Sequence, residues 1–197
     1  MTAPRTSTQA RATAETRIDL ELNLDGTGRS RICTGLPFFD HMLMALAKHA
    51  RFDLTLTATG DLEVDDHHTI EDCALVLGRA LGEALGDRAG ITRYGWAIAP
   101  LDEALVRVVV DLSGRPWPAV ELRLEREMLG AVATENLTHF FNTLAIEARL
   151  ALHVTCLAGA NDHHKSEAAF KALALALRAA VARTTSADVP STKGVLQ

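Results

Sequence analysis

The chain has 197 residues, enough for one sizeable core or for two small cores fused together. No apolar run approaches the roughly 18 residues of a membrane helix, and the N-terminus lacks the apolar segment of a signal peptide. A net charge of −5, without any block rich in lysine or arginine, argues against nucleic-acid binding. We therefore expect a non-membrane, globular protein.

The first half of the chain alternates between strand and helix patterns. Residues 1–10 are rich in small and polar residues and are predicted to be a disordered tail. Apolar residues then recur at every second position in TRIDLELNLDG, which indicates a strand that ends in an Asp-Gly turn. The predicted elements are strands at 16–26 and 31–33, a helix at 38–50, a strand at 51–60 and a helix at 69–86.

The second half repeats the same order of patterns. Its predicted elements are strands at 104–114 and 119–125, a helix at 135–148, a strand at 149–159 and a helix at 163–183. Both halves therefore read as β-β-α-β-α, which predicts an α+β fold. We place the first repeat at 11–100, the second at 101–187 and a C-terminal tail at 188–197.

The similarity of the two halves extends to individual residues. A shift of 96 positions aligns residues 66–85 with 162–181, and eight of the twenty aligned positions are identical. Matches of alanine and leucine are common in helices, but a repeated Asp-His-His-x-x-Glu at the same helix start is not. The chain is therefore an internal duplication, and the duplicated polar residues are of metal-ligand types.

Together with His41 and His139, which a shift of 98 positions aligns, each half contributes three histidines and one glutamate to the duplicated set. The set consists of His41, His67, His68 and Glu71 in the first half and His139, His163, His164 and Glu167 in the second. A single histidine at a helix start is usually a surface or structural residue, but that interpretation does not explain a duplicated motif. Imidazole and carboxylate ligands suit Mn, Fe, Co, Ni or Zn, and the absence of thiolates favours a catalytic site over a structural zinc site.

Neighbouring histidines on one helix point in different directions. Adjacent side chains lie about 100° apart around a helix, so both imidazoles of one pair cannot serve one metal. His68 and Glu71 are three positions apart and can share a face. The economical arrangement is then two crossed sets, with four ligands each: His41, His68, Glu71 and His163, and His139, His164, Glu167 and His67.

The spacing allows the two halves to meet either within one chain or between subunits. A crossed arrangement between chains would require a closed oligomer.

Other residues that could carry chemistry are more scattered. His49 ends a predicted helix, whereas His153 lies inside a predicted strand and is expected to be structural. Lys171 follows Glu167 by four positions and can reach the same site. The three cysteines, which are widely spaced, suit buried thiols in a reducing cytoplasm: Cys33, Cys73 and Cys156.

A set of motifs together resembles the imidazoleglycerol-phosphate dehydratase family. The motifs are FFDHML (38–43), DDHHTIED (65–72), GITRYG (90–95), DEAL (102–105), DLSGRP (111–116), HFFNTLA (139–145), GANDHHKSEAAFKALALALR (159–178) and PSTKG (190–194). They occur in order without large gaps, from about residue 11 to the C-terminus. The resemblance therefore covers nearly the whole chain.

The resemblance implies a fold, an assembly and a reaction. Each repeat would be similar to domain 2 of ribosomal protein S5, with the sheets packed against a layer of helices. Members form a shell of 24 subunits with octahedral symmetry, with two Mn²⁺ ions in each active site between subunits, although other divalent transition metals fit the ligands. The reaction removes water from D-erythro-imidazole glycerol phosphate to give imidazole acetol phosphate in histidine biosynthesis.

The resemblance also assigns roles to single residues. The six histidines and two glutamates of the duplicated set match the metal ligands. Five residues match contacts to the substrate phosphate: Arg93, Arg115, Lys171, Ser191 and Lys193. Glu15 matches a glutamate near the reacting carbons, and we also take His41, His49, His67 and His163 as candidate substrate contacts.

The proposed chemistry depends on the substrate ring. The proton to be removed is not acidic, because no carbonyl group stands beside it, so we expect the ring to be held as an imidazolate that bridges the two metals. Glu15 is the candidate acid or base, in competition with metal-bound water. Glu71 and Glu167 are further catalytic candidates in addition to being ligands.

Two other functions are compatible with the ligand set alone. A dinuclear metallohydrolase of a phosphorylated small molecule would use similar ligands but would release inorganic phosphate. A non-catalytic metal-binding shell is the other possibility, although ferritin-like sites are rich in carboxylates and lie on four long helices.

Overall fold

Each repeat of the chain forms a four-stranded sheet and two helices. The computed structural model describes residues 4–196. The first unit contains β1 (Thr6–Ala12), β2 (Thr16–Asn23), β3 (Ser30–Cys33), α1 (Pro37–Ala50), β4 (Asp53–Gly60) and α2 (His67–Leu85). The second contains β5 (Tyr94–Leu101), β6 (Ala104–Asp111), β7 (Trp117–Glu121), β8 (Met128–Leu129), β9 (Val132–Ala133), α3 (Thr134–Glu147), β10 (Ala151–Ala158) and α4 (Asp162–Ala180).

The two large sheets have the same topology. Their strand orders are β1-β2-β4-β3 and β5-β6-β10-β7. In each sheet the last strand of the order runs parallel to its neighbour, and the other pairs are antiparallel. The predicted α+β fold with an internal duplication is confirmed, and each unit begins with one strand more than the predicted order.

The additional strands lie in segments that the sequence pattern did not identify. Residues 6–10, predicted to be part of a disordered tail, belong to β1, which pairs with β2 from Thr6 to Ala12. β1 is an edge strand of small and polar residues, and its burial alternates only weakly. Its sequence therefore lacks the alternating apolar residues that would predict a strand. Residues 1–3 of the predicted tail lie outside the described residues.

The predicted boundary between the repeats, at residues 100 and 101, lies inside the second sheet and does not separate the two sheets. β5 forms an antiparallel hairpin with β6 across that boundary, so residues 94–100 belong to the second unit. Another difference concerns Cys33, which is exposed, whereas Cys73 and Cys156 are buried as expected. The reason is strand alternation on β3, where Ile32 faces the core and Cys33 faces outward.

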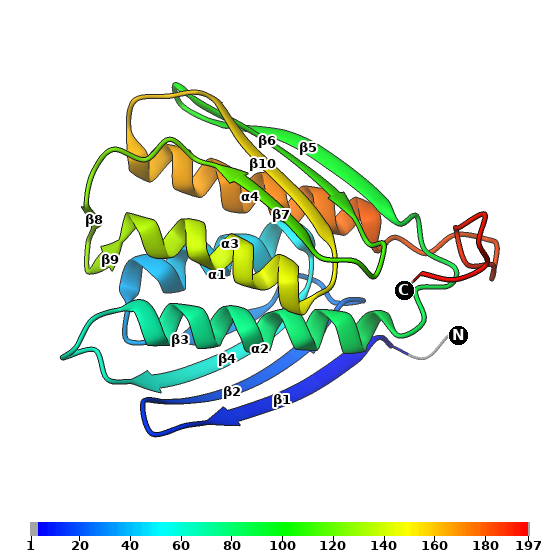
Figure 1. Cartoon of the computed structure of the whole chain (residues 1–197), viewed down its shortest axis with the longest axis horizontal. Coiled ribbons are helices and arrows are strands. Elements are labelled where there is room, and N and C mark those ends of the chain that lie inside the picture. Colours follow the sequence, from blue (N-terminus) through cyan, green and yellow to red (C-terminus); the bar gives the residue numbers. More distant parts are fainter. Residues whose placement is uncertain (1–3, 197) are drawn as a thin grey trace.

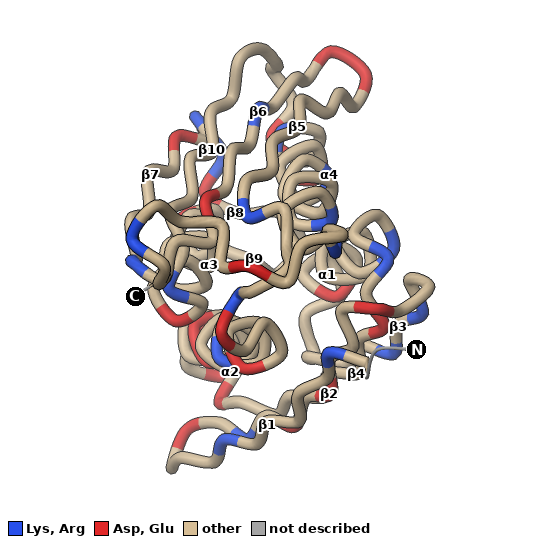
Figure 2. The backbone as a smooth tube through the Cα atoms, turned by 90° about the vertical axis from the view of Figure 1, so that its right-hand side faces the viewer, with Lys and Arg blue, Asp and Glu red and all other residues tan. Residues whose placement is uncertain are grey.

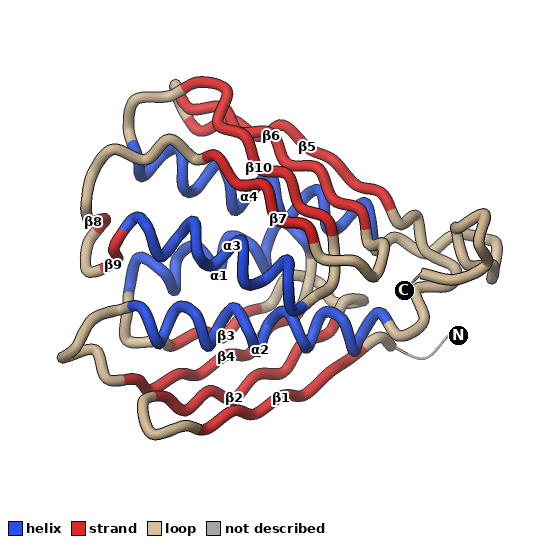
Figure 3. The backbone as a smooth tube through the Cα atoms, viewed as in Figure 1, coloured by secondary structure: helices blue, strands red, loops and turns tan. Residues whose placement is uncertain are grey.

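The four helices lie between the two sheets. Figures 1 and 3 show one sheet above the helix layer and one below it, and Figure 2 shows the same layers in a view along the helices. Four phenylalanines from α1, α3 and α4 meet within this layer: Phe39, Phe140, Phe141 and Phe170. The duplicated units therefore share one hydrophobic core.

No helix within residues 4–196 is both long enough and apolar enough to cross a membrane.

A glycine allows α2 and α3 to approach closely. A methyl group added at Gly78 would lie 2.6 Å from Cβ of Glu147 and 3.1 Å from the nitrogen of Ala148. One turn later, a methyl group at Gly82 would meet its nearest atoms at 3.9 Å. The two positions therefore differ in the space available beside α3.

This difference gives a paired prediction. Gly78→Ala should reduce the free energy of unfolding, because overpacking costs about 1–3 kcal/mol and outweighs the improved helix propensity. Gly82→Ala should leave stability unchanged or raise it by up to about 1 kcal/mol. Urea unfolding of the two variants would test this, and equal stabilities would contradict the proposed packing constraint.

Candidate metal centre

The candidate ligands lie in the first two turns of the helices. Figure 1 shows all four helices beginning on the same side of the molecule. A buried aspartate precedes each His-His pair and fixes the start of its helix. Oδ2 of Asp66 accepts from the nitrogen of Ala133, and Oδ2 of Asp162 accepts from the nitrogens of Glu125 and Arg126. The Asp162 carboxylate also receives a hydrogen bond of 2.9 Å from the buried Lys165 ammonium.

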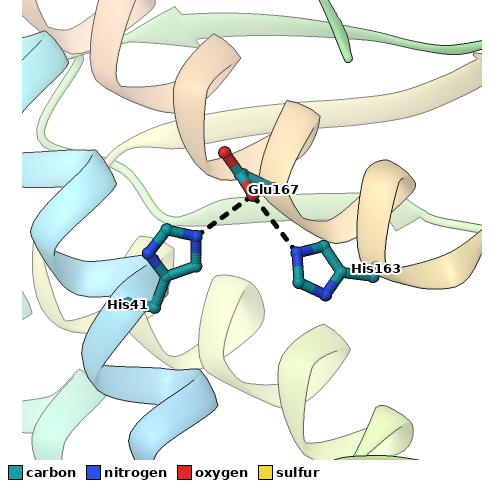
Figure 4. Close-up of side chains that lie close together, drawn as sticks. All are labelled: His41, His163 and Glu167. Atoms are coloured by element: carbon teal, nitrogen blue, oxygen red, sulfur yellow. Dashed lines mark hydrogen bonds and ion pairs between the residues drawn. The ribbon is translucent and has the colours of Figure 1, made fainter. Parts of the chain in front are cut away.

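One triad of ligand types joins α1 to α4. Nε2 of His41 lies 3.1 Å from Oε2 of Glu167, and Nε2 of His163 lies 3.3 Å from the same oxygen. One ligand atom from each residue lies within 4.8 Å of the others. Figure 4 shows the two imidazoles converging on the Glu167 carboxylate from two helices. The geometry suits a single ion held between the three groups.

The second triad joins α2 to α3 in the same way. Nε2 of His139 lies 3.1 Å from Oε1 of Glu71, and Nε2 of His67 lies 3.8 Å from Oε2. The His67 and His139 rings stack with their centroids 4.9 Å apart. Nδ1 of His67 lies 2.9 Å from Oδ1 of Asn136, so it donates to that amide oxygen and leaves Nε2 available as a ligand.

Both triads fit a divalent transition metal. Two imidazoles and one carboxylate provide three nitrogen and oxygen donors and leave open coordination positions for water or substrate. Such a set is compatible with manganese but does not select it among the first-row metals.

The carboxylates are exchanged relative to the predicted sets. The sequence grouped His41 and His163 with Glu71, and His67 and His139 with Glu167, whereas within one chain each pair lies with the other glutamate. The prediction used three-residue spacing from His68 to Glu71. In the structure, the four-residue spacing from His67 places its ring beside Glu71, on the side of α2 that faces α3.

His68 and His164 lie outside both triads. Nδ1 of His68 lies 3.1 Å from Oδ2 of Asp61, and Nδ1 of His164 lies 2.7 Å from Oε2 of Glu103. These hydrogen bonds raise the pKa of both imidazoles above the ordinary value. The bond to His164 also lowers the pKa of Glu103 to about 2.

The Glu167 carboxylate has an additional cationic neighbour. Nζ of Lys171 lies 2.7 Å from Oε1 of Glu167. Burial alone would raise the pKa of Glu167, but hydrogen bonds from Lys171 and His41 outweigh it and hold the pKa at about 2. Glu167 is therefore ionised at neutral pH and ready to bind a cation.

Four of the predicted phosphate contacts gather at the other end of the helices. A cavity of about 600 Å³ is lined by Arg93, Arg115, Ser191 and Lys193, together with Tyr94, Pro190, Thr192 and Leu196. Arg93 donates to both oxygens of Asp111 and to the carbonyl of Pro190, which fixes the C-terminal segment against this pocket. These cations and hydroxyls are suited to a phosphate group.

The pocket and the triads of one chain are far apart. The nitrogen of Arg93 bonds to the carbonyl of Ala180 at the end of α4, whereas His163 lies at its start. The intervening helix is about 26 Å long at 1.5 Å per residue. Lys171, the fifth predicted phosphate contact, lies beside Glu167 and not in the pocket.

The remaining candidates lie around the triads or away from them. Oε1 of the half-exposed Glu15 is 3.9 Å from Nε2 of His68. His49 ends α1, where burial and then the charge of Lys171 lower its pKa. His153 faces outward on β10, outside both triads.

Sequence reasoning missed three residues that form hydrogen bonds with Nδ1 of a histidine. Asn136, Asp61 and Glu103 hydrogen-bond to His67, His68 and His164, respectively. None has an equivalent at the repeat shift of 96, so the duplication gave no signal for them. Glu103 lies within the DEAL motif, but that motif alone did not indicate its partner.

Comparisons with known proteins identify one family. A family model described as imidazoleglycerol-phosphate dehydratase matches residues 34–177. The protein of that name from Methanothermobacter thermautotrophicus is 50% identical and is covered over 100% of both chains. The one from Phytophthora nicotianae is 57% identical over 95% of this chain, which spans 41% of that longer protein.

Solved structures carry the same description. The crystal structure of imidazoleglycerol-phosphate dehydratase from Staphylococcus aureus aligns with a TM-score of 0.83 and 37% identity, covering 91% of this chain and 99% of that one. The corresponding structure from Pyrococcus furiosus aligns with a TM-score of 0.81 and 41% identity, covering 95% and 100%.

Metal binding should depend on pH through the histidines. A metal binds neutral imidazole, and the raised pKa values of His68 and His164 extend their protonated range above the ordinary value. If these imidazoles are ligands, the affinity for Mn²⁺ should rise from pH 6 to pH 8, by up to about tenfold per pH unit for each displaced proton. Titration with Mn²⁺ followed by electron paramagnetic resonance would measure this, and a flat profile would contradict it.

Proposed function

The chain belongs to the imidazoleglycerol-phosphate dehydratase family of hydro-lyases, and on this premise we propose how it dehydrates D-erythro-imidazole glycerol phosphate to imidazole acetol phosphate in histidine biosynthesis. The observation that carries the proposal is the pair of His-Glu-His triads at one end of the helix layer. We assign one Mn²⁺ ion to each triad, and other divalent transition metals fit the same donors.

Each metal site is completed by a second copy of the chain. Three donors leave a position open for a fourth protein ligand. The side chains of His68 and His164 are partly exposed, by 32% and 26%, and lie outside the triads of their own chain. We assign His68 of a neighbouring copy to the triad of His41, and His164 of a neighbouring copy to the triad of His67. This assignment keeps the crossed histidines of the sequence-based sets.

The phosphate pocket supports the same arrangement. A substrate with a three-carbon chain cannot reach from the ring-binding triads to a pocket about one helix length away in the same chain. Arg93, Arg115, Ser191 and Lys193 therefore serve a site on a neighbouring copy, with residues 188–197 as the segment that clamps the phosphate. An octahedral shell of 24 subunits, as the family resemblance implies, would place these surfaces together.

The metal ions and the side chains have different roles in the proposed reaction. When bound, two divalent ions supply the Lewis acidity that stabilises the substrate ring as a bridging imidazolate. The hydroxyl group leaves from the carbon attached to the ring, and Glu15 takes the proton from the next carbon of the side chain, because its carboxylate lies next to His68, which we place at the metal. Arg93 and Lys193 hold the phosphate and thereby fix the orientation of the reacting carbons.

Other contacts position the ring and the phosphate. Lys171 is paired with Glu167, and His49 lies close enough to both for their charges to affect its pKa. Glu71 and Glu167 act as metal ligands in this scheme.

The free thiols of Cys33, Cys73 and Cys156 support a location in a reducing compartment, and we propose the cytoplasm.

Metal removal should abolish both activity and assembly. Treatment with a chelator should stop formation of imidazole acetol phosphate and reduce the sedimentation coefficient, because the proposed sites join neighbouring copies. Adding Mn²⁺ should restore both. A metal-free protein that still turns over substrate, or one that releases inorganic phosphate from it, would contradict the proposed reaction.

Replacement of the proposed proton-transfer group should separate catalysis from metal binding. Glu15→Gln should lower kcat by about 10²–10⁴-fold, the usual contribution of general acid–base catalysis, without changing the metal content. Glu21→Gln, on the outward face of β2, is a matched control with the same loss of charge and should keep full activity. Wild-type turnover in the Glu15 variant would exclude the assignment.

A further inference from the structure

The two histidines outside the triads share a second feature. His68 and His164 are equivalent in the internal repeat, and a carboxylate accepts a hydrogen bond from Nδ1 of each ring. A carboxylate can only accept, so the proton of each neutral ring lies on Nδ1 and Nε2 carries the free lone pair. The same tautomer is therefore selected in both halves.

The carboxylates that make these contacts come from different places in the two units. Asp61 directly follows β4, whereas Glu103 lies in the turn between β5 and β6. Position 159, which follows β10 as Asp61 follows β4, is a glycine. The duplication therefore does not explain why both histidines have a carboxylate partner. The hydrogen bond from Nδ1 to a carboxylate is shared by the two halves, although the residues that provide the carboxylates are not equivalent.

Glu103 is fixed in place by the backbone before α4. Its Oε1 accepts from the nitrogen of Ala160 at 3.2 Å and from the nitrogen of Asn161 at 2.8 Å. Asn161 in turn accepts from the nitrogen of His163 and caps the helix. The other oxygen, Oε2, is thereby directed at Nδ1 of His164 at 2.7 Å.

We propose that Asp61 and Glu103 are positioning residues that hold Nδ1 of His68 and His164 protonated and so direct Nε2 of each ring to a metal ion bound by a neighbouring copy. The proposal rests on the intersubunit ligand assignment given above. Partners of this kind orient metal-binding imidazoles and strengthen them as ligands, and their loss weakens metal binding by about 10–100-fold.

Glu103→Gln is the sharpest test, because the backbone determines how the amide is oriented. Its oxygen replaces Oε1 as acceptor for the nitrogens of Ala160 and Asn161, which leaves the amide NH₂ facing His164. An NH₂ group donates to Nδ1 and moves the ring proton to Nε2, the atom required by the metal. The fold contacts are kept while the tautomer is reversed.

The experiment titrates the metal-depleted full-length protein with Mn²⁺ and counts the sites per chain by calorimetry and electron paramagnetic resonance. In Glu103→Gln, one of the two sites should bind about 10–100-fold more weakly, and the other should be unchanged. Excess Mn²⁺ should restore kcat. Asp61→Ala should weaken the other site, and it provides an independent variant if Glu103→Gln does not fold.

Asp102→Asn is the matched control for charge. Asp102 lies in the same turn, 3.8 Å from Nε2 of His164, but makes no hydrogen bond to Nδ1. This variant should keep both affinities near the wild-type values. An equal loss in Asp102→Asn and Glu103→Gln would show that turn charge, and not the tautomer, is responsible, and would overturn the proposal.

His164→Asn distinguishes an error in the ligand assignment from an error in the positioning role of the carboxylates. If it retains both sites at wild-type affinity, the ligand assignment under the proposed function is wrong. If it loses one site while Glu103→Gln and Asp61→Ala bind Mn²⁺ as the wild type does, the ligand assignment holds and the positioning role is overturned.

Discussion

The angle between adjacent residues on a helix governs the arrangement of the candidate site. Because neighbouring side chains diverge by about 100°, each His-His pair sends one imidazole toward a facing helix and the other away from it. His67 joins the triad with α3, and His163 joins the triad with α1. His68 and His164 are held on other faces by carboxylates. A chain with this geometry carries two triads of ligand-type residues and two imidazoles that neither triad includes.

The proposed function makes activity depend on assembly, because each triad would take a fourth ligand from a neighbouring copy. The pocket that contains Arg93, Arg115 and Lys193 lies at the opposite end of α4 from His163. In the proposed scheme, a neighbouring copy therefore completes both the metal set and the substrate site. Helices packed between two sheets, with a close approach at Gly78, provide a rigid frame that holds the triads and the pocket at a fixed separation.

The duplication preserved the ligands while their surroundings diverged. His67 is hydrogen-bonded to Asn136, whereas the equivalent His163 packs edge-on against the ring of Phe38 at 5.1 Å. Glu167 is paired with Lys171, while position 75, the equivalent of Lys171, is a leucine. The two candidate metal sites therefore have the same donors but different electrostatic environments.

The sequence by itself determined the duplication, the α+β class and the eight ligand-type residues, because Asp-His-His-x-x-Glu recurs at a fixed shift and apolar periodicity records local structure. It missed β1 and β5, which are weakly patterned or lie across the expected boundary. Only the tertiary structure decided that Glu71 lies with His67 and His139, and that Asp61 and Glu103 hold the remaining imidazoles. Those pairings depend on how helices and turns distant in the chain pack together, which spacing along one helix does not specify.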